Sequence, residues 1–166
     1  MIALVHNIGT KKDPNYTNKE AVYICKELIT CDGVYRSVLK NVEVLKGKKV
    51  ILFVVGDLVG GDNSEINPDK PLEQFCDWRE IGFLEGYLGA QIGWHSWTHR
   101  DLTKLSDKEL KKELEPPGMI EKKYFAYPYG KFDVRVIQAV RDAGYKMAFS
   151  VDAGDGSDYQ ITRKAL

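Results

Sequence analysis

Short apolar runs alternate with amphipathic segments along the chain, and the apolar runs have the pattern of strands. Residues 50–55 read Val-Ile-Leu-Phe-Val-Val and are followed by Gly56, as expected for a strand buried on both faces of a parallel sheet. Further strands are predicted over the ranges 1–5, 28–31, 91–94, 124–127 and 147–151. The shorter runs are followed by polar or glycine-containing segments, which favours strands separated by loops and helices.

Several segments between these strands have the signals of helices. One apolar stripe has offsets of three, seven and ten residues and consists of Tyr35, Val38, Val42 and Leu45. Ser106 and Glu109 form a capping-box pattern at the start of a second helix. Asp133 can cap a third helix, which Gly144 would end. Strands that alternate with helices predict a parallel α/β fold, in which functional residues lie at the carboxyl ends of the strands.

Length and charge limit the size of the fold and the kind of partner. The chain of 166 residues suits one domain over residues 1–166, but a complete barrel commonly needs about 200 residues or more. We therefore expect shortened helices. The 24 basic and 24 acidic side chains give no net charge, which argues against nucleic acid or an anionic membrane as partner.

The sequence shows no signal for export or membrane insertion. The first residues, Met-Ile-Ala-Leu-Val-His, lack the basic start and long apolar run of a secretory signal, and no later run approaches a membrane span. The three cysteines have no Cys-x-x-Cys spacing, which favours reduced thiols over a disulfide framework. The chain as written therefore predicts a cytoplasmic protein, although a chain trimmed of its export signal would give the same pattern.

Two of the three histidines, His95 and His99, lie four residues apart directly after the predicted strand 91–94. One helical turn would place both imidazoles on the same face, where they could reach one cation. Two surface histidines that meet by chance are the alternative. Their place at a strand end favours the metal site.

Three other motifs follow predicted strands in a fixed order. They read Ile-Thr-Cys-Asp-Gly at 29–33, Phe-Val-Val-Gly-Asp at 53–57 and Phe-Ala-Tyr-Pro-Tyr-Gly at 125–130. Together with His-Ser-Trp-Thr-His at 95–99, they resemble the polysaccharide deacetylases of carbohydrate esterase family four, the NodB-homology group. The resemblance covers roughly residues 28–152. The last motif is similar to the branch that reads Phe-x-Tyr-Pro-Tyr-Gly.

The resemblance implies a distorted, incomplete (β/α) barrel with a parallel sheet, shortened relative to the family. It also implies a hydrolase that removes acetyl groups from N-acetylated sugars in a polysaccharide or glycan, cutting a carbon–nitrogen bond that is not a peptide bond. The implied cofactor is a divalent metal, with zinc expected first and cobalt or nickel as alternatives. The expected partner is therefore a carbohydrate, and the sequence leaves the oligomeric state open.

By similarity, His95 and His99 match the family's metal-binding histidines, and the backbone N–H of Tyr129 matches its oxyanion donor. A cation can polarise the acetyl carbonyl and lower the pKa of a water molecule. A carboxylate can then take the proton of the attacking water, while an N–H stabilises the tetrahedral oxyanion. Asp32 is the expected carboxylate.

The first motif departs from the family's Thr-Phe-Asp-Asp-Gly, and two alignments are open. The alignment without a gap, which we prefer, makes Asp32 the catalytic base and puts Gly33 where the metal-binding aspartate should be. The other makes Asp32 the metal ligand, puts Cys31 at the base and treats Val34 as an insertion. One carboxylate is missing in both alignments.

Further departures concern the arginine and the late histidine of the family. Ala126 stands where many members have an arginine that pairs with the base, and no histidine follows His99 to protonate the leaving amine. His6 ends the predicted strand 1–5 and is expected to supply either that acid or a third metal ligand. A hydrogen-bonded rim residue is the alternative for His6. Asp57 or Asp152 could replace the missing carboxylate.

Two classes of function remain open from the sequence. The first is the metal-dependent deacetylase. The second is a catalytically impaired deacetylase-fold protein that acts as a carbohydrate-binding or regulatory module, and Gly33 favours this reading. A zincin-like protease is disfavoured because Ser96 stands where His-Glu-x-x-His needs its glutamate.

Overall fold

The structure is a computed structural model that describes residues 22–25, 28–66, 68–69, 72–151 and 154–165. The predicted strand 1–5, His6 and Asp152 lie outside these residues. Six strands run parallel and pair in sequence order: β2 (Leu28–Asp32), β3 (Lys49–Val54), β4 (Gln91–Trp94), β5 (Tyr124–Ala126), β6 (Met147–Val151) and β7 (Ile161–Ala165). They form the strongly curled, incomplete (β/α) barrel that the resemblance implied.

One strand without a counterpart in the sequence prediction joins the two edges of the parallel sheet. β1 (Val22–Cys25) pairs antiparallel with β2 on one side and with β7 on the other, so the seven described strands close into a ring. β1 thereby satisfies the backbone groups that the edges of an open sheet would leave unpaired.

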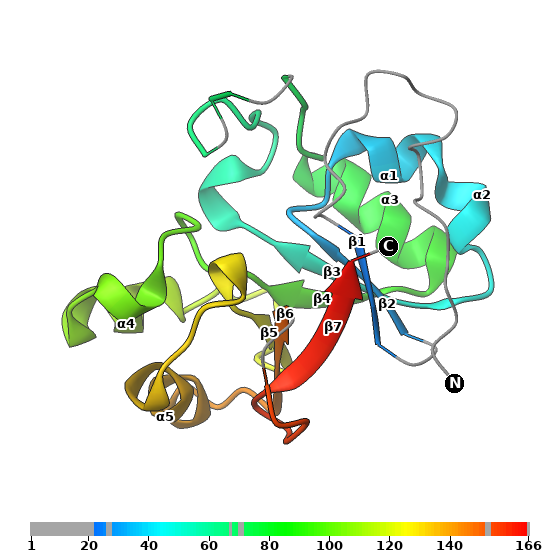
Figure 1. The fold of residues 1–166 in the computed structure, drawn as a ribbon. Coiled ribbons are helices and arrows are strands. Elements are labelled where there is room, and N and C mark those ends of the chain that lie inside the picture. The colour runs from blue at the N-terminus through cyan, green and yellow to red at the C-terminus, as the bar shows by residue number, and fades with distance from the viewer. Residues whose placement is uncertain (1–21, 26–27, 67, 70–71, 152–153, 166) are drawn as a thin grey trace.

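The helices lie on the outside of this ring. α1 (Arg36–Lys40), α2 (Val42–Leu45) and α3 (Trp78–Leu88) group on one side, and α4 (Asp107–Glu113) and α5 (Val134–Asp142) group on another (Figure 1). Three short 3-10 helices, η1 (Gly56–Leu58), η2 (Leu102–Lys104) and η3 (Pro128–Gly130), follow strands or strand-end loops. None of the helices in the described ranges is long and apolar enough to cross a membrane.

The helix signals of the sequence are confirmed where they involve caps. The Ser106 hydroxyl and the Glu109 carboxylate make both bonds of a capping box at the start of α4, and the Asp133 carboxylate accepts the Val136 N–H of α5. The stripe at 35–45 forms two short helices instead of one, because the chain leaves helical geometry at Asn41, where φ is −116°.

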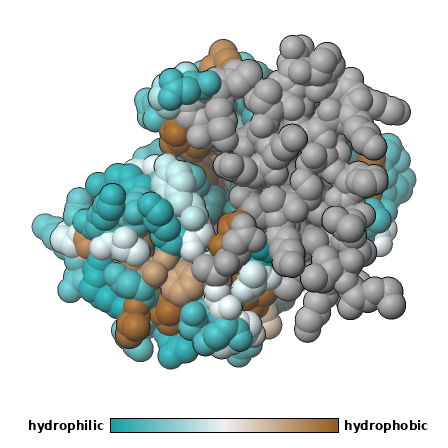
Figure 2. Space-filling view, in the orientation of Figure 1, coloured by the Kyte–Doolittle hydropathy of each residue, from teal (hydrophilic) through white to brown (hydrophobic). Residues whose placement is uncertain are grey.

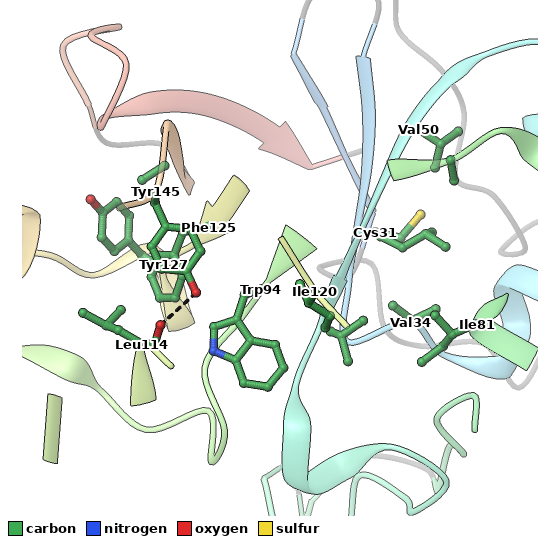
Figure 3. Close-up of a cluster of buried hydrophobic side chains, with 14 of the residues drawn as sticks. Cys31, Val34, Val50, Ile81, Trp94, Leu114, Ile120, Phe125, Tyr127 and Tyr145 are labelled. Atoms are coloured by element: carbon green, nitrogen blue, oxygen red, sulfur yellow. Dashed lines mark hydrogen bonds between the residues drawn. The ribbon is translucent and has the colours of Figure 1, made fainter. Parts of the chain in front are cut away.

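Residues of β3 show how the core is divided. Val50, Leu52 and Val54 pack in the cluster between the sheet and the helices, whereas Ile51 and Phe53 pack in a separate cluster inside the barrel. This alternation is the period of two expected for a strand. The outer cluster also holds the aromatic group around Trp94, Phe125 and Tyr145 (Figure 3); the Tyr145 hydroxyl donates to the Leu114 carbonyl oxygen over 2.9 Å.

Figure 2 shows the outer surface around α4 and α5 as a mixture of hydrophilic and hydrophobic residues. A groove between these helices has a volume of about 940 Å³, and its lining includes apolar Leu110 and Val134 as well as charged Lys111 and Arg135. The groove lies on the outside of the barrel, between the two helices.

Candidate active site

The site residues predicted from the sequence lie at the carboxyl ends of the parallel strands. Asp32 is the last residue of β2, His95 directly follows β4, and Tyr129 lies in η3 just after β5. The fold brings Asp32 and His99 to the same place as His95, and the ring of Tyr129 contacts the ring of His99. His6, the remaining predicted residue, lies outside the described ranges.

His95 and His99 face each other. Their Nε2 atoms are 3.2 Å apart, and their ring planes meet at 75°. The Nδ1 atom of His95 lies 2.8 Å from the carbonyl oxygen of Ala126. A carbonyl can only accept a hydrogen bond, so Nδ1 carries the proton and Nε2 presents its lone pair toward His99.

A loop with left-handed residues, not a helical turn, brings the two rings together. Residues 95–99 are not helical. The prediction that a helical turn places both imidazoles on one face is therefore wrong, although the two rings do meet. Ser96 and His99 have φ values of +68° and +55°, and this region costs about 1–2 kcal/mol for a residue with a side chain. The hydroxyl of Ser96 accepts a hydrogen bond from the His99 N–H over 3.0 Å and supports the turn.

Burial keeps both imidazoles neutral. It lowers the pKa of His95, and the charge of Asp32 opposes this shift only in part. Burial, followed by repulsion from His95, lowers the pKa of His99 to about 3. Neutral imidazole is the form that binds metal ions, so both rings have the right protonation state at neutral pH.

Asp32 is held by an arginine that the sequence analysis did not single out. Arg163 on β7 is fully buried, and its Nη1 and Nη2 atoms donate to Oδ1 and Oδ2 of Asp32 over 2.7 and 2.9 Å. Two further donors of the guanidinium bind the hydroxyl of Thr30 and the carbonyl oxygen of Ser150. Such a bidentate pair fixes the plane of the carboxylate as well as its position.

The arrangement fits a shared cation in part. Two donors on one tetrahedral zinc ion, each about 2.0–2.1 Å from it, lie about 3.3 Å apart. The Nε2 atoms of His95 and His99 are 3.2 Å apart, and Oδ2 of Asp32 is 3.7 Å from Nε2 of His95. Across the described ranges, however, no group of three or more histidine, cysteine, aspartate or glutamate side chains is arranged to hold a metal ion. The imidazole pair fits, while a complete ligand set is not formed.

Tyr129 has the backbone of a strained residue next to this pair. Its φ and ψ are +57° and +14°, and its ring meets the ring of His99 edge-on at 4.6 Å between centroids. The side chain stays exposed. Backbone strain of this kind concentrates at functional sites, where the surrounding structure fixes it.

In the alignment without a gap, the family's metal-binding aspartate falls at Gly33, where the structure leaves no room for a side chain. An added Cβ would lie 2.7 Å from a ring carbon of Phe75, and the φ of +81° also disfavours a side chain. The ring of Phe75 stacks on Tyr35 at 4.3 Å. The space that a side chain at position 33 would need is therefore filled by Phe75, and an aspartate there would require Phe75 and Tyr35 to move.

Two other residues considered from the sequence lie apart from the histidines. Cys31 is buried in the outer core with Val50 (Figure 3), and burial raises the pKa of its thiol to about 12. Asp57 is exposed on η1; no hydrogen bond or ion pair in the described part of the chain links its carboxylate to His95 or His99. Asp152 lies outside the described residues.

Sequence reasoning missed Arg163 and Glu113, which make close contacts around the site. Arg163 belongs to a strand of mixed polarity, Ile-Thr-Arg-Lys-Ala, which has no apolar run to mark it. Glu113 lies in the charged segment 107–113, a pattern typical of a solvated helix face, but it is buried and accepts hydrogen bonds from Trp97 and Thr98. A buried charge can be recognised only once its partners are known.

Residues 29–148 match the family described as polysaccharide deacetylase. The match spans Asp32, His95, His99 and Tyr129 and covers most of the chain. The protein therefore belongs to the polysaccharide deacetylase family, as the motifs predicted. Its assignment to the Phe-x-Tyr-Pro-Tyr-Gly branch stays a prediction. No curated protein matches the chain.

Solved structures share the fold at low sequence identity. The Streptococcus pyogenes deacetylase PplD, in complex with acetate, is 16% identical with a TM-score of 0.61, covering 82% of this chain and 62% of its own. IcaB from Ammonifex degensii is 20% identical with a TM-score of 0.59 and coverages of 73% and 57%. The BpsB deacetylase domain from Bordetella bronchiseptica is 14% identical with a TM-score of 0.62 and coverages of 83% and 69%. The chain thus spans about three fifths of the first two proteins.

Proposed function

We propose that this protein is a metal-dependent hydrolase that removes acetyl groups from N-acetylated sugars of a polysaccharide or glycan. The observation that carries the proposal is the convergence of Asp32, His95 and His99 at the carboxyl ends of the barrel strands. Membership of the polysaccharide deacetylase family supports the reaction. The acetate in the PplD structure is the product that such a reaction releases.

His95 and His99 would hold the divalent ion, with the Asp32 carboxylate beside them. When bound, an ion such as zinc would act as a Lewis acid toward the acetyl carbonyl and lower the pKa of a nearby water. Each neutral imidazole has one nitrogen lone pair for it, and in His95 this lone pair lies on Nε2 because Nδ1 donates to Ala126. Cobalt or nickel would suit the same donors.

Asp32 is the general base in this proposal. Its carboxylate would take the proton of the attacking water, in agreement with the alignment that has no gap. Arg163 holds both carboxylate oxygens and so keeps the base in one orientation. We infer that Arg163 replaces the arginine that many members carry where this chain has Ala126. The guanidinium lies over the rings of Phe53 and Phe149, which share the interior cluster with Ala126.

Tyr129 and His6 complete the proposed set. The backbone N–H of Tyr129 would donate to the tetrahedral oxyanion, a role for which rigid donors are effective. The left-handed backbone at Tyr129 and its contact with His99 support this placement. His6 stays our proposal for the acid that protonates the leaving amine, or for a third metal ligand.

A second function is favoured by one observation. In the alignment without a gap, the ring of Phe75 fills the space at Gly33 that the usual second carboxylate would need. A protein that retained the barrel and the histidines without catalysis could serve as a carbohydrate-binding or regulatory module.

Acetate release from an N-acetylated glucosamine oligomer, measured with and without zinc, distinguishes the two functions. We expect zinc-dependent release by the wild type and a loss of at least about a hundredfold in Asp32→Asn, which removes the base. Asp57→Asn, the matched change at a neighbouring strand end, should keep wild-type activity. Binding of the oligomer without acetate release in all zinc conditions would instead support the carbohydrate-binding module.

A further inference from the structure

The Glu113 side chain is a buried carboxylate that binds the loop between the two histidines. Glu113 ends α4 and is 3% exposed. Its Oε2 atom accepts the backbone N–H of Trp97 over 2.8 Å and that of Thr98 over 3.0 Å, and its Oε1 atom accepts the Thr98 hydroxyl over 2.6 Å. Burying a carboxylate is costly unless it is hydrogen-bonded or paired, so these three bonds, together with a longer contact from Nη2 of Arg100 to Oε1 (3.5 Å), allow Glu113 to be buried.

The loop that Glu113 binds needs support from outside. It begins and ends with two left-handed residues, Ser96 and His99, and a backbone of this kind persists only when the surroundings fix it. The carbonyl oxygens of Ser96 and Trp97 accept N–H groups from the segment after β3. Glu113 satisfies the opposite set of groups, the N–H donors of Trp97 and Thr98.

The orientation of the His99 ring depends on this loop more than that of His95 does. The His95 ring is fixed by the bond between its own Nδ1 and Ala126. The Nδ1 atom of His99 is buried and has no hydrogen-bond partner in the described part of the chain. The backbone conformation of His99 therefore has to direct its Nε2 atom toward His95.

We propose that Glu113 is a positioning residue of the candidate metal site. Its carboxylate holds the backbone of Trp97 and Thr98 and so keeps the His99 imidazole where it can share a cation with His95. The role in cation binding rests on the proposed function, whereas the effect on the loop does not.

The bonding pattern predicts that glutamine can replace Glu113 and alanine cannot. Both backbone N–H groups are bound by the same carboxylate oxygen, which an amide oxygen can mimic. The amide NH₂ of glutamine would then face the hydroxyl of Thr98, which can accept as well as donate. Alanine removes these three contacts and also a longer one, in which Nη2 of Arg100 donates to Oε1 over 3.5 Å; glutamine loses only the charge of this longer contact. The Glu113 carbonyl oxygen still binds the Trp94 indole in every variant, because that contact is made by the main chain.

Zinc titration of the full chain by calorimetry tests the proposal. We expect Glu113→Ala to bind zinc at least about tenfold more weakly than the wild type, the size of effect seen for groups that orient metal ligands. Glu113→Gln should stay close to the wild type. Glu109→Ala is the matched control, because Glu109 lies one turn earlier on α4, caps the helix and does not touch Trp97 or Thr98; its link toward the loop is an ion pair with the exposed Arg100 side chain.

Amide hydrogen exchange without metal gives the second measurement. In Glu113→Ala, exchange at Trp97 and Thr98 should become faster while exchange in β3 stays as in the wild type. If Glu113→Ala does not fold, Glu113→Asp takes its place; its carboxylate is one carbon shorter, and we expect it to change exchange and zinc binding in the same direction.

Zinc titration and hydrogen exchange together distinguish a failure of the positioning role from a failure of the proposed metal function. A zinc-binding wild type together with unchanged zinc affinity and exchange in Glu113→Ala would overturn the positioning role alone. Equal losses in Glu113→Ala and Glu109→Ala would also overturn it, because general destabilisation of α4 would then explain both. A wild type that binds no zinc would contradict the proposed metal function and the cation part of this inference, whatever the exchange rates show.

Discussion

Arg163 and Asp32 are far apart in the sequence but form a bidentate ion pair inside the barrel. The guanidinium is fully buried and its donors are shared among Asp32, Thr30 and the Ser150 carbonyl. A charge buried in this way is stable only while all its partners are present. The pair therefore links the orientation of the proposed base to the stability of the barrel.

Two substitutions of Arg163 distinguish its role in orienting the Asp32 carboxylate from its role as a positive charge. Arg163→Met leaves Asp32 without its partner, so we expect a loss of about 3–5 kcal/mol in the free energy of unfolding, measured by urea denaturation. Arg163→Lys retains the charge but cannot bind both carboxylate oxygens in the same plane, so its acetate release should fall more than its stability. Full activity in Arg163→Lys would show that the orientation of Asp32 by Arg163 is unimportant.

A substitution of Gly33 tests whether the missing carboxylate can be restored. Gly33→Ala should lower the free energy of unfolding by more than Gly47→Ala, because both positions have positive φ but an added Cβ at Gly47 meets nothing within 4 Å. Gly47→Ala measures the backbone cost alone, about 1–2 kcal/mol. Thermal unfolding of both variants gives the comparison. Equal losses would mean that Phe75 yields easily and that Gly33→Asp could rebuild the family motif.

At the scale of elements, the sequence predicted what apolar runs and caps can show. The cores of β2 to β6 and the starts of α4 and α5 follow from such signals. α3 was missed, although Asp77 and Glu80 form the same kind of capping box as Ser106 and Glu109. β7 was missed because its side chains do not form an apolar run, and Arg163 on it faces the barrel interior.

The cap of α4 predicts how stability depends on pH. Hydrogen bonds from Ser106 lower the pKa of the Glu109 carboxyl from 4.5 to about 2. Since the folded pKa is depressed, this contribution to stability is complete above about pH 4.5 and is lost as the pH falls toward about 2. In thermal unfolding, the wild type should exceed Glu109→Gln at pH 7 and match it near pH 2. A difference that is independent of pH would contradict this assignment.

At the scale of the whole molecule, the parallel strands deliver four separate sequence motifs to one rim. The sequence alone placed Asp32, His95 and Tyr129 there because each follows a strand, and the carboxyl ends of parallel strands lie together. It could not show that Arg163 supports Asp32 or that Glu113 supports the loop before His99. These contacts depend on how distant segments pack, and no local pattern marks them.

The proposed function requires the two imidazoles to share one ion beside Asp32. A crystal structure of the protein grown with zinc, with an anomalous difference map at the zinc absorption edge, would locate this ion. We predict a single peak about 2.0–2.1 Å from Nε2 of both His95 and His99, next to the Asp32 carboxylate. The same map would show whether His6 is a ligand. Imidazole rings that point apart with no peak between them would show that the histidines do not form a metal site.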